Sequence, residues 1–300
     1  MHLRRKVLQI GPLSTKSAKT ESVELVVSQT IIEGRLVKNT NLLLIALSAV
    51  AISSTVKADP WEPGYGVGIN YAPSYELDGS SGNSMEGHLL GARLEVASGN
   101  KVPMRASLAY SMGSTKHRGE DIYKGVKADD SVLALELAAG YSIEGDSLEV
   151  IPFAGLGFRE MRQSFKSGPA APDNDIATSA RKHRLFYLPL GFYVGSTSSL
   201  KLVNIYYSVT WMPVISGEAK IGGGKSSARM TLNNGYGLKL EAGFHVPTES
   251  SWNFVTGIFF EQWDLNSSYK GVRSAGGTEI IERETNTRTQ VIGINAGVRF

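Results

Sequence analysis

The residues best suited to acid–base chemistry gather in one polar segment, residues 113–130. Paired carboxylates beside a histidine can activate a water molecule when all the groups come within hydrogen-bond reach of it. The candidates in this segment are His117, Glu120, Asp121, Asp129 and Asp130. Their spacing lacks the regular order and the central glycine of a dedicated calcium-binding loop, so we expect no metal site there.

In one kind of hydrolytic site, such carboxylates face an Asp–His pair that another part of the chain contributes. The segment that would have to supply them, residues 212–234, contains only Glu218 as an acid and has no histidine. An Asp–His base cannot be assembled from that composition. We therefore expect no protease-like site.

A histidine beside a serine is the other arrangement that could carry a reaction, because the histidine can activate the hydroxyl as a nucleophile. His88 and His183 have serines nearby in the sequence, namely Ser80, Ser81, Ser84 and Ser179. Serines are also common in polar loops for conformational reasons alone. We expect ordinary polar residues here and predict no catalytic residue, no cofactor and no metal.

Composition excludes further chemistry. The 300 residues include no cysteine, which rules out thiol catalysis, disulfides and thiolate metal sites. The formal net charge is +3, but the basic excess lies before residue 58, and the rest of the chain is slightly acidic. Nucleic acid is therefore not an expected partner.

The first 58 residues contain the pattern of a secretory signal. Lys38 precedes an apolar run at 42–52, and Val56-Lys57-Ala58 places small side chains where a signal peptidase cleaves. We predict a signal peptide over 36–58 that is cleaved after Ala58. Residues 1–35 are interpreted as an upstream extension caused by a misassigned start, and 59–300 as one domain.

After the leader, apolar residues alternate with small or polar ones, which is the period of a strand with two unlike faces. Leu133, Leu135 and Leu137 share one face of such a run, and Ala134 and Glu136 share the other. Each run is long enough for the roughly 9–11 residues of a tilted membrane-spanning strand. There are ten: 64–75, 85–97, 102–112, 131–143, 148–158, 183–195, 200–211, 235–246, 251–263 and 289–300.

The connections between these runs alternate in length. Four are tight polar turns, at 98–101, 144–147, 196–199 and 247–250. The other five are polar and mostly longer, at 76–84, 113–130, 159–182, 212–234 and 264–288. This sorting is typical of an outer-membrane barrel, with short periplasmic turns and longer external loops. The sequence predicts an all-β fold, a transmembrane antiparallel up-and-down β-barrel of about ten strands, give or take two.

Alternation also sorts the side chains of the predicted barrel. Aromatic residues expected at the two membrane interfaces are Tyr71, Tyr110, Tyr141, Phe158, Trp211, Trp252 and Trp263. Charged residues expected in the lumen are Arg93, Glu95, Arg105, Glu136, Glu149, Lys239, Glu241, Glu261 and Arg299, and His245 is a further polar lumen group. A barrel near eight strands has an interior that side chains can fill, so we expect a plugged or very narrow lumen.

The end of the chain resembles a known class. Alternating apolar residues lead to the terminal Phe300, which is similar to the C-terminal strand of Gram-negative outer-membrane proteins, although glycine placement around Asn295 departs slightly. The run Ile151–Phe158 resembles a strand of small porin-like and opacity-type surface barrels. The resemblance implies location in the cell outer membrane and Phe300 as a signal for the barrel-assembly machinery. Omptin proteases are also ten-stranded, but the missing Asp–His pair argues against that activity.

Three functional hypotheses remain. The first is a non-enzymatic, porin-like or surface-exposed barrel with an envelope or adhesion role through its external loops, whose surface ligand is unknown. The second is a narrow channel for small solutes, and the third is a lipid-modifying enzyme using a rim histidine. The expected partners include outer-membrane lipid and lipopolysaccharide, because an arginine guanidinium can donate two parallel hydrogen bonds to the oxygens of a phosphate. The basic pairs at the external ends of strands are Lys116 with Arg118, Arg159 with Arg162, and Arg181 with Arg184.

Overall fold

A computed structural model describes the chain from Trp61 to Phe300, except for residues 62, 80–83, 100, 119–124, 167–179, 197–202, 224–225, 233, 248–251, 267–270, 276–277 and 283–285. The predicted signal peptide and the segment before it lie outside the described residues. No helix in the described part is long and apolar enough to span a bilayer.

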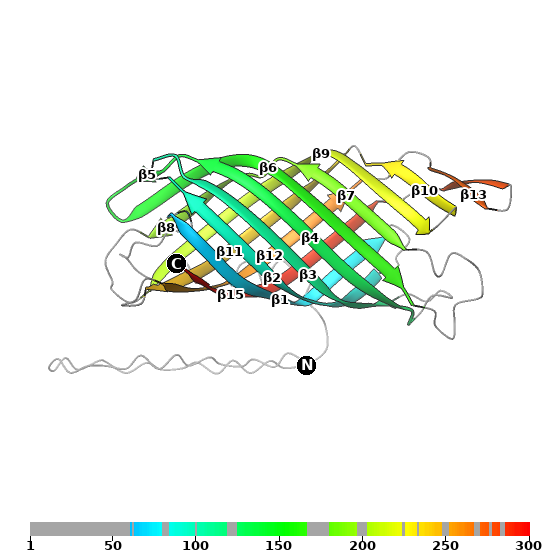
Figure 1. Cartoon of the computed structure of the whole chain (residues 1–300), viewed down its shortest axis with the longest axis horizontal. Coiled ribbons are helices and arrows are strands. Elements are labelled where there is room, and N and C mark those ends of the chain that lie inside the picture. Colours follow the sequence, from blue (N-terminus) through cyan, green and yellow to red (C-terminus); the bar gives the residue numbers. More distant parts are fainter. Residues whose placement is uncertain are drawn as a thin grey trace, which may run out of the picture. The chain divides into compact units, whose positions relative to one another are not determined.

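The described residues form a closed antiparallel barrel of ten strands, as the alternation predicts (Figure 1). One of these ten strands is divided into two segments, β7 and β8, which count together as one. Pro189 lies between them and interrupts the strand because it has no N–H to donate. The barrel strands are β1 (Gly64–Gly79), β2 (Ser84–Ser98), β3 (Met104–Arg118), β4 (Lys127–Gly140), β6 (Leu148–Phe165), β7 (Arg181–Tyr187), β8 (Leu190–Ser196), β9 (Asn204–Gly223), β11 (Gly235–Pro247), β12 (Asn253–Leu265) and β15 (Thr287–Arg299).

Each of the ten barrel strands pairs with its neighbours in the sequence, and β15 pairs with β1 to close the cylinder. The seam continues to the last residue, since the backbones of Tyr65 and Phe300 exchange hydrogen bonds at 3.1 and 2.9 Å. Closure gives every strand a partner on both sides, which a sheet in hydrocarbon requires. Short additional strands are β5 (Ile143–Glu144), β10 (Ser226–Thr231), β13 (Gly271–Ala275) and β14 (Thr278–Glu282).

The strands run further than predicted at one end of the barrel. β9 reaches Gly223 and β6 reaches Phe165, so much of 159–182 and 212–234 is strand rather than loop. The region 264–288 likewise contains the hairpin β13–β14. The apolar alternation ends where contact with lipid ends, whereas the hydrogen-bonded ladder continues, and the sequence pattern therefore marks only the membrane part. This extended end lies opposite the C-terminus (Figure 1) and corresponds to the external side.

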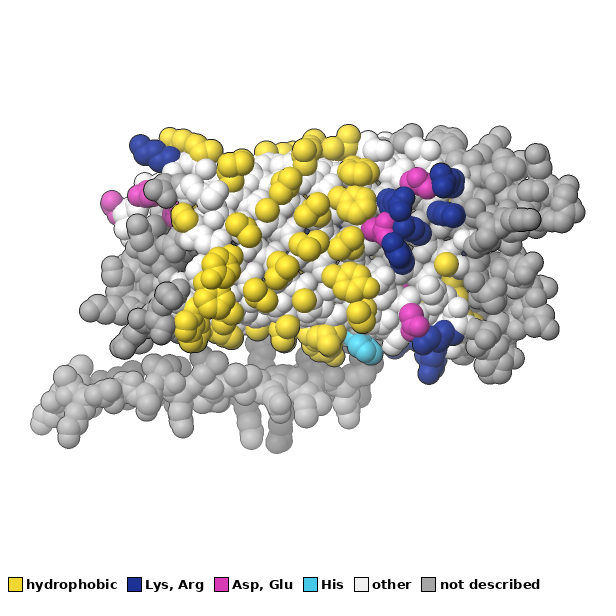
Figure 2. Space-filling model, in the orientation of Figure 1, with side chains coloured by type: hydrophobic (Ala, Val, Ile, Leu, Met, Phe, Trp, Pro, Cys, Tyr) yellow, Lys and Arg dark blue, Asp and Glu magenta, His cyan; other side chains and the backbone are white. Residues whose placement is uncertain are grey.

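The outer face has the apolar surface of a membrane protein. On the face shown in Figure 2, apolar side chains form a broad band across the wall, and charged side chains gather beyond its external edge. Ile69, Leu156 and Ile258, from three strands spaced around the barrel, are 60, 61 and 50% exposed. Such exposure in water would be unfavourable over so wide an area, but it suits contact with lipid.

Candidate functional site

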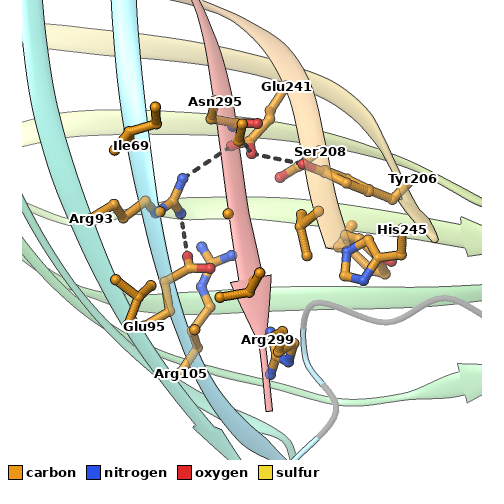
Figure 3. Close-up of a pocket in the computed structure, with 18 residues that line it drawn as sticks. Ile69, Arg93, Glu95, Arg105, Tyr206, Ser208, Glu241, His245, Asn295 and Arg299 are labelled. Carbon is orange, nitrogen blue, oxygen red and sulfur yellow. Dashed lines mark hydrogen bonds and ion pairs between the residues drawn. The ribbon is translucent and has the colours of Figure 1, made fainter. Parts of the chain in front are cut away.

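The lumen contains the predicted charged residues. All nine lie on the inner face by the register of their strands, and most of them line two small cavities of about 60 and 100 Å³. Figure 3 shows the cavity on the periplasmic side, where Arg93, Glu95, Arg105, Glu241 and Arg299 converge.

Glu241 is the centre of this network. Its carboxylate accepts hydrogen bonds from Asn295 at 2.9 Å and from the hydroxyl of Tyr206 at 3.1 Å. Lys239 lies 3.1 Å from it and Arg93 lies 3.7 Å from it. Arg93 also pairs with Glu95 at 2.5 Å, as Figure 3 shows. Mixed charges thus pair across the interior instead of lining one wall with one sign.

A second layer crosses the lumen on the external side of this network. Trp263 of β12 contacts Tyr187 of β7 with ring centroids 5.0 Å apart, although these strands are not neighbours in the sheet. The Tyr187 hydroxyl donates to Glu136 of β4 at 2.8 Å. The Trp263 indole donates to Glu261 at 2.7 Å, and the Arg159 guanidinium lies over the Trp263 ring at 5.1 Å. Side chains from strands that are not neighbours in the sheet therefore meet inside the barrel.

Two of these residues correct the sequence analysis. Trp263 was expected in the outer aromatic girdle, and Arg159 on the outer rim, but both point inward and are 1 and 4% exposed. Trp263 is two residues from the inward-facing Glu261, and Arg159 is two residues from the inward-facing Gly157, so each lies on the inner face of its strand. Their residue type suggested an interface position, and the two-residue period of the strand overrides that suggestion.

Apolar clusters lie on both sides of the charged layer. On the periplasmic side Trp61, Ile151 and Phe153 pack together, and the Arg105 guanidinium covers the Trp61 ring at 4.8 Å. The external half contains two clusters of buried residues, one around Tyr75 and Met161 and one around Leu185, Met212 and Trp263. The narrow or plugged lumen that the sequence predicts therefore agrees with the packing of the described residues.

The histidines proposed for chemistry lie on different faces of the wall. His88 is exposed on the outer face of β2, whereas His183 points inward from β7 and is 3% exposed. The partner serines Ser80, Ser81 and Ser179 lie outside the described residues. His245 is a lumen group as predicted, with its ring 5.3 Å from that of Tyr206.

The acidic residues of 113–130 are also separated. Asp130 points into the lumen and accepts a hydrogen bond from Thr115 at 2.5 Å, whereas Asp129 points outward and pairs with Lys166 at 2.8 Å. Glu218 points outward too, 3.6 Å from Arg229. Glu120 and Asp121 lie outside the described residues. Among the residues the structure describes, no group of three or more His, Asp or Glu could hold a metal ion.

A compact charged cluster lies on the outer wall beyond the apolar band. Glu160 is 7% exposed and is covered by three cations. Arg162 and Arg184 donate to its two carboxylate oxygens at 2.6 and 2.7 Å, and Lys182 lies 2.9 Å away. Burial raises the pKa of this external carboxyl, but hydrogen bonds from the three cations outweigh burial and hold the pKa at about 2. The carboxylate thus stays ionised and fixes the cations in place.

Sequence reasoning found only part of this cluster. It named Arg162 and Arg184, but it also named Arg181, which by its pairing opposite Gln163 points inward. It did not name Lys182, Lys220 or Arg229. Every second residue from the lipid-facing Phe158 and Phe186 points outward. Counting in this way would have selected the outward cations if the predicted strands had reached this part of the chain.

An apolar outer band, a closed hydrogen-bonded sheet and a polar interior define a membrane-spanning β-barrel. Residues 42–300 match the family model described as outer membrane protein beta-barrel domain, and the chain belongs to this family. The protein is accordingly located in the outer membrane. Comparison with curated proteins gave no significant match.

Several solved structures are similar in fold but distant in sequence. They include the outer membrane protease OmpT from Escherichia coli, with 8% identity over 79% of this chain and 96% of that chain and a TM-score of 0.45. Neisserial surface protein A has 11% identity with coverage of 79 and 96% and a TM-score of 0.33. The attachment invasion locus protein Ail of Yersinia pestis has 13% identity, coverage of 79 and 99% and a TM-score of 0.29. None shares enough sequence to transfer a site or an activity.

Proposed function

We propose that this protein is a non-enzymatic surface barrel with a closed lumen, which acts through the external part of its wall and its external loops. The observation that carries the proposal is the contact of Tyr187 with Trp263 across the interior, together with the hydrogen bond from Tyr187 to Glu136. These contacts join three separate parts of the wall. A lumen bridged in this way favours a role on the surface over one in transport.

The external end of the barrel supports this proposal. β9 and β6 continue past the apolar band, and β10 and the hairpin β13–β14 add further strand there. Strands that continue beyond the membrane on one side form an ordered surface outside the cell, which an envelope or adhesion role would use.

A narrow channel for small solutes is the second candidate. Its specific support is that both cavities are lined in part by Arg93 and Asn295, so they adjoin in the middle of the barrel. Charged walls of both signs can line a selective pore. A lipid-modifying enzyme receives less support, because His88 and His183 lie on opposite faces of the wall.

Planar-bilayer recording separates the first two functions. The protein purified from outer membranes should give no discrete current steps after insertion, which flotation of proteoliposomes verifies independently. The double variant Tyr187→Ala/Trp263→Ala removes the bridge across the lumen and should conduct measurably. The matched variant Trp211→Ala/Tyr236→Ala removes two aromatic rings from the outer face and should stay silent. Reproducible steps from the unaltered protein would contradict the closed-lumen proposal and favour the channel.

A further inference from the structure

A row of four cations crosses the outer wall near its external end. Arg162 of β6 is paired opposite Lys182 of β7, and Lys182 is paired opposite Lys220 of β9. Lys220 is in turn opposite Arg229 of β10. These four residues, called here the cation row, face outward on four neighbouring strands. The dark blue side chains beyond the apolar band in Figure 2 show where charge gathers on this wall.

Such a row is unfavourable in the isolated barrel. Neighbouring strands lie about 4.8 Å apart, and like charges directly opposite each other in a sheet are destabilising. The adjacent row toward the membrane contains two acids, Glu160 and Glu218, together with a further cation, Arg184. Five cations and two carboxylates leave this part of the wall with a local excess of positive charge.

The cations are held in place but remain accessible. Glu160 is nearly buried beneath them, whereas the side chains of Arg162 and Arg184 are 61 and 48% exposed. The Arg229 side chain is 72% exposed. A guanidinium has five N–H donors, and Arg162 uses its Nε and one Nη on Glu160. The arrangement orders the guanidinium groups and still presents them to an incoming anion.

Their height on the wall indicates where that anion is. Phe158 of β6 and Phe186 of β7 pack together at 5.1 Å on the outer face, and Phe186 is 53% exposed. Arg162 lies four residues after Phe158, and Lys182 lies four residues before Phe186, both toward the external end. Four residues correspond to roughly 13 Å of strand before tilt is considered. Acyl chains at the level of the two phenylalanines would place lipid phosphates close to the row.

A groove runs along the wall at this level. It has a volume of about 560 Å³ and is lined by Phe158, Phe186, Glu160, Arg184 and Arg229, among others. Its membrane side is aromatic and its external side is charged. A molecule with an apolar part and a phosphate fits this order, whereas a fully soluble anion would use only the charged half.

We propose that the cation row and Arg184 bind the phosphate groups of a phosphorylated lipid of the outer leaflet, of the lipopolysaccharide class, whose acyl chains contact Phe158 and Phe186. Glu160 is a positioning residue for this site because it orders three of the cations. The site depends on the placement of the wall in the outer membrane and is independent of whether the lumen conducts, so a conductance result leaves it unaffected.

Native mass spectrometry of the detergent-purified protein with lipid A tests the site. Bisphosphorylated lipid A should bind, and enzymatically dephosphorylated lipid A should bind about tenfold or more weakly, as expected for loss of charge-assisted hydrogen bonds. The variant Arg162→Gln/Lys182→Gln should lose a similar factor. A second variant, Lys220→Gln/Arg229→Gln, leaves the Glu160 contacts intact and should also weaken binding, which guards against a folding defect in the first.

The control variant is Lys116→Gln/Arg118→Gln, which removes two outward-facing cations from β3 on another part of the wall. It should retain binding. An equal loss in the control would show general attraction to positive charge and would overturn the site. Equal binding of dephosphorylated lipid would do the same, and full displacement of lipid A by equimolar inorganic phosphate would assign the row to a soluble anion instead.

Discussion

At the scale of single residues, ion pairs have different roles on the two faces of the wall. In the lumen they are enclosed and join strands to one another, and Glu241 alone contacts groups from β2, β9, β11 and β15. On the outer wall they organise a surface, and Glu160 gathers cations that would otherwise repel each other. The two carboxylates therefore lead to different predictions.

Replacing Glu160 by Gln should lower barrel stability. Arg162, Lys182 and Arg184 lose their shared countercharge, and a loss of about 2 kcal/mol follows from hydrogen bonds to charged groups. The measurement is the temperature at which the folded, fast-migrating form disappears in gel electrophoresis. Glu218→Gln is the control, since that carboxylate is 40% exposed with one cation at 3.6 Å, and it should have little effect. Equal effects of the two substitutions would contradict the role given to Glu160.

Replacing Glu241 by Gln should be more damaging. It leaves Arg93 and Lys239 in an enclosed interior without their shared carboxylate, and removal of one member of a buried pair is expected to destabilise by about 3–5 kcal/mol. Denaturant unfolding of the refolded barrel measures this loss. The double variant Glu241→Leu/Arg93→Met removes both charges and should recover part of it. No recovery would mean that the two side chains are not coupled.

At the scale of the strand, Phe300 directly follows β15, and its ring stacks on that of Tyr65 with the centroids 5.2 Å apart. We expect Phe300→Ala to reduce the amount of assembled barrel in cells, because the assembly machinery is proposed to recognise the terminal aromatic residue. Refolding of the purified variant into detergent should be nearly normal, since the backbone pairing with Tyr65 remains.

Phe254→Ala is the matched control, as it removes an exposed aromatic ring from the outer face of β12. It should assemble normally in cells. If Phe300→Ala failed equally in cells and in detergent, the residue would be structural and the recognition role would be lost.

The strand pattern also shows how far the sequence leads. The sequence predicts the ten strands, their inward and outward faces and the charged lumen, because a strand in a membrane has two chemically unlike sides. The external extensions were not, since strand pairing outside lipid needs no apolar face. The interruption at Pro189 was not recognised either, although proline disfavours strand interiors.

The candidate sites were predictable to a smaller extent. Counting by two places the charged residues in the lumen, but it does not reveal that Tyr187 reaches Trp263 across the interior. That contact depends on which strands face each other in the closed cylinder. The cation row likewise depends on the register of four strands, and no single segment of the sequence contains it.

At the scale of the whole molecule, the barrel combines a lipid-facing wall, a filled interior and an extended external end. Closure without a free edge explains how the chain resides in the outer membrane. The filled interior directs function to the outside, to the external strands and to the wall itself. The lipid site and the closed lumen are separate consequences of this one arrangement.

The central claim is that the outer face of the wall meets lipid while the inner face meets other side chains. The chain has no cysteine, so single cysteines can be introduced along β4 and labelled with a nitroxide. Collision rates with lipid-soluble oxygen and with a water-soluble nickel chelate are then measured in bilayers. Labels at Leu133, Leu135 and Leu137 should collide with oxygen, and labels at Ala134 and Ala138 should be protected from both reagents. High accessibility of the inward positions to the nickel chelate would reveal a water-filled lumen and contradict the account.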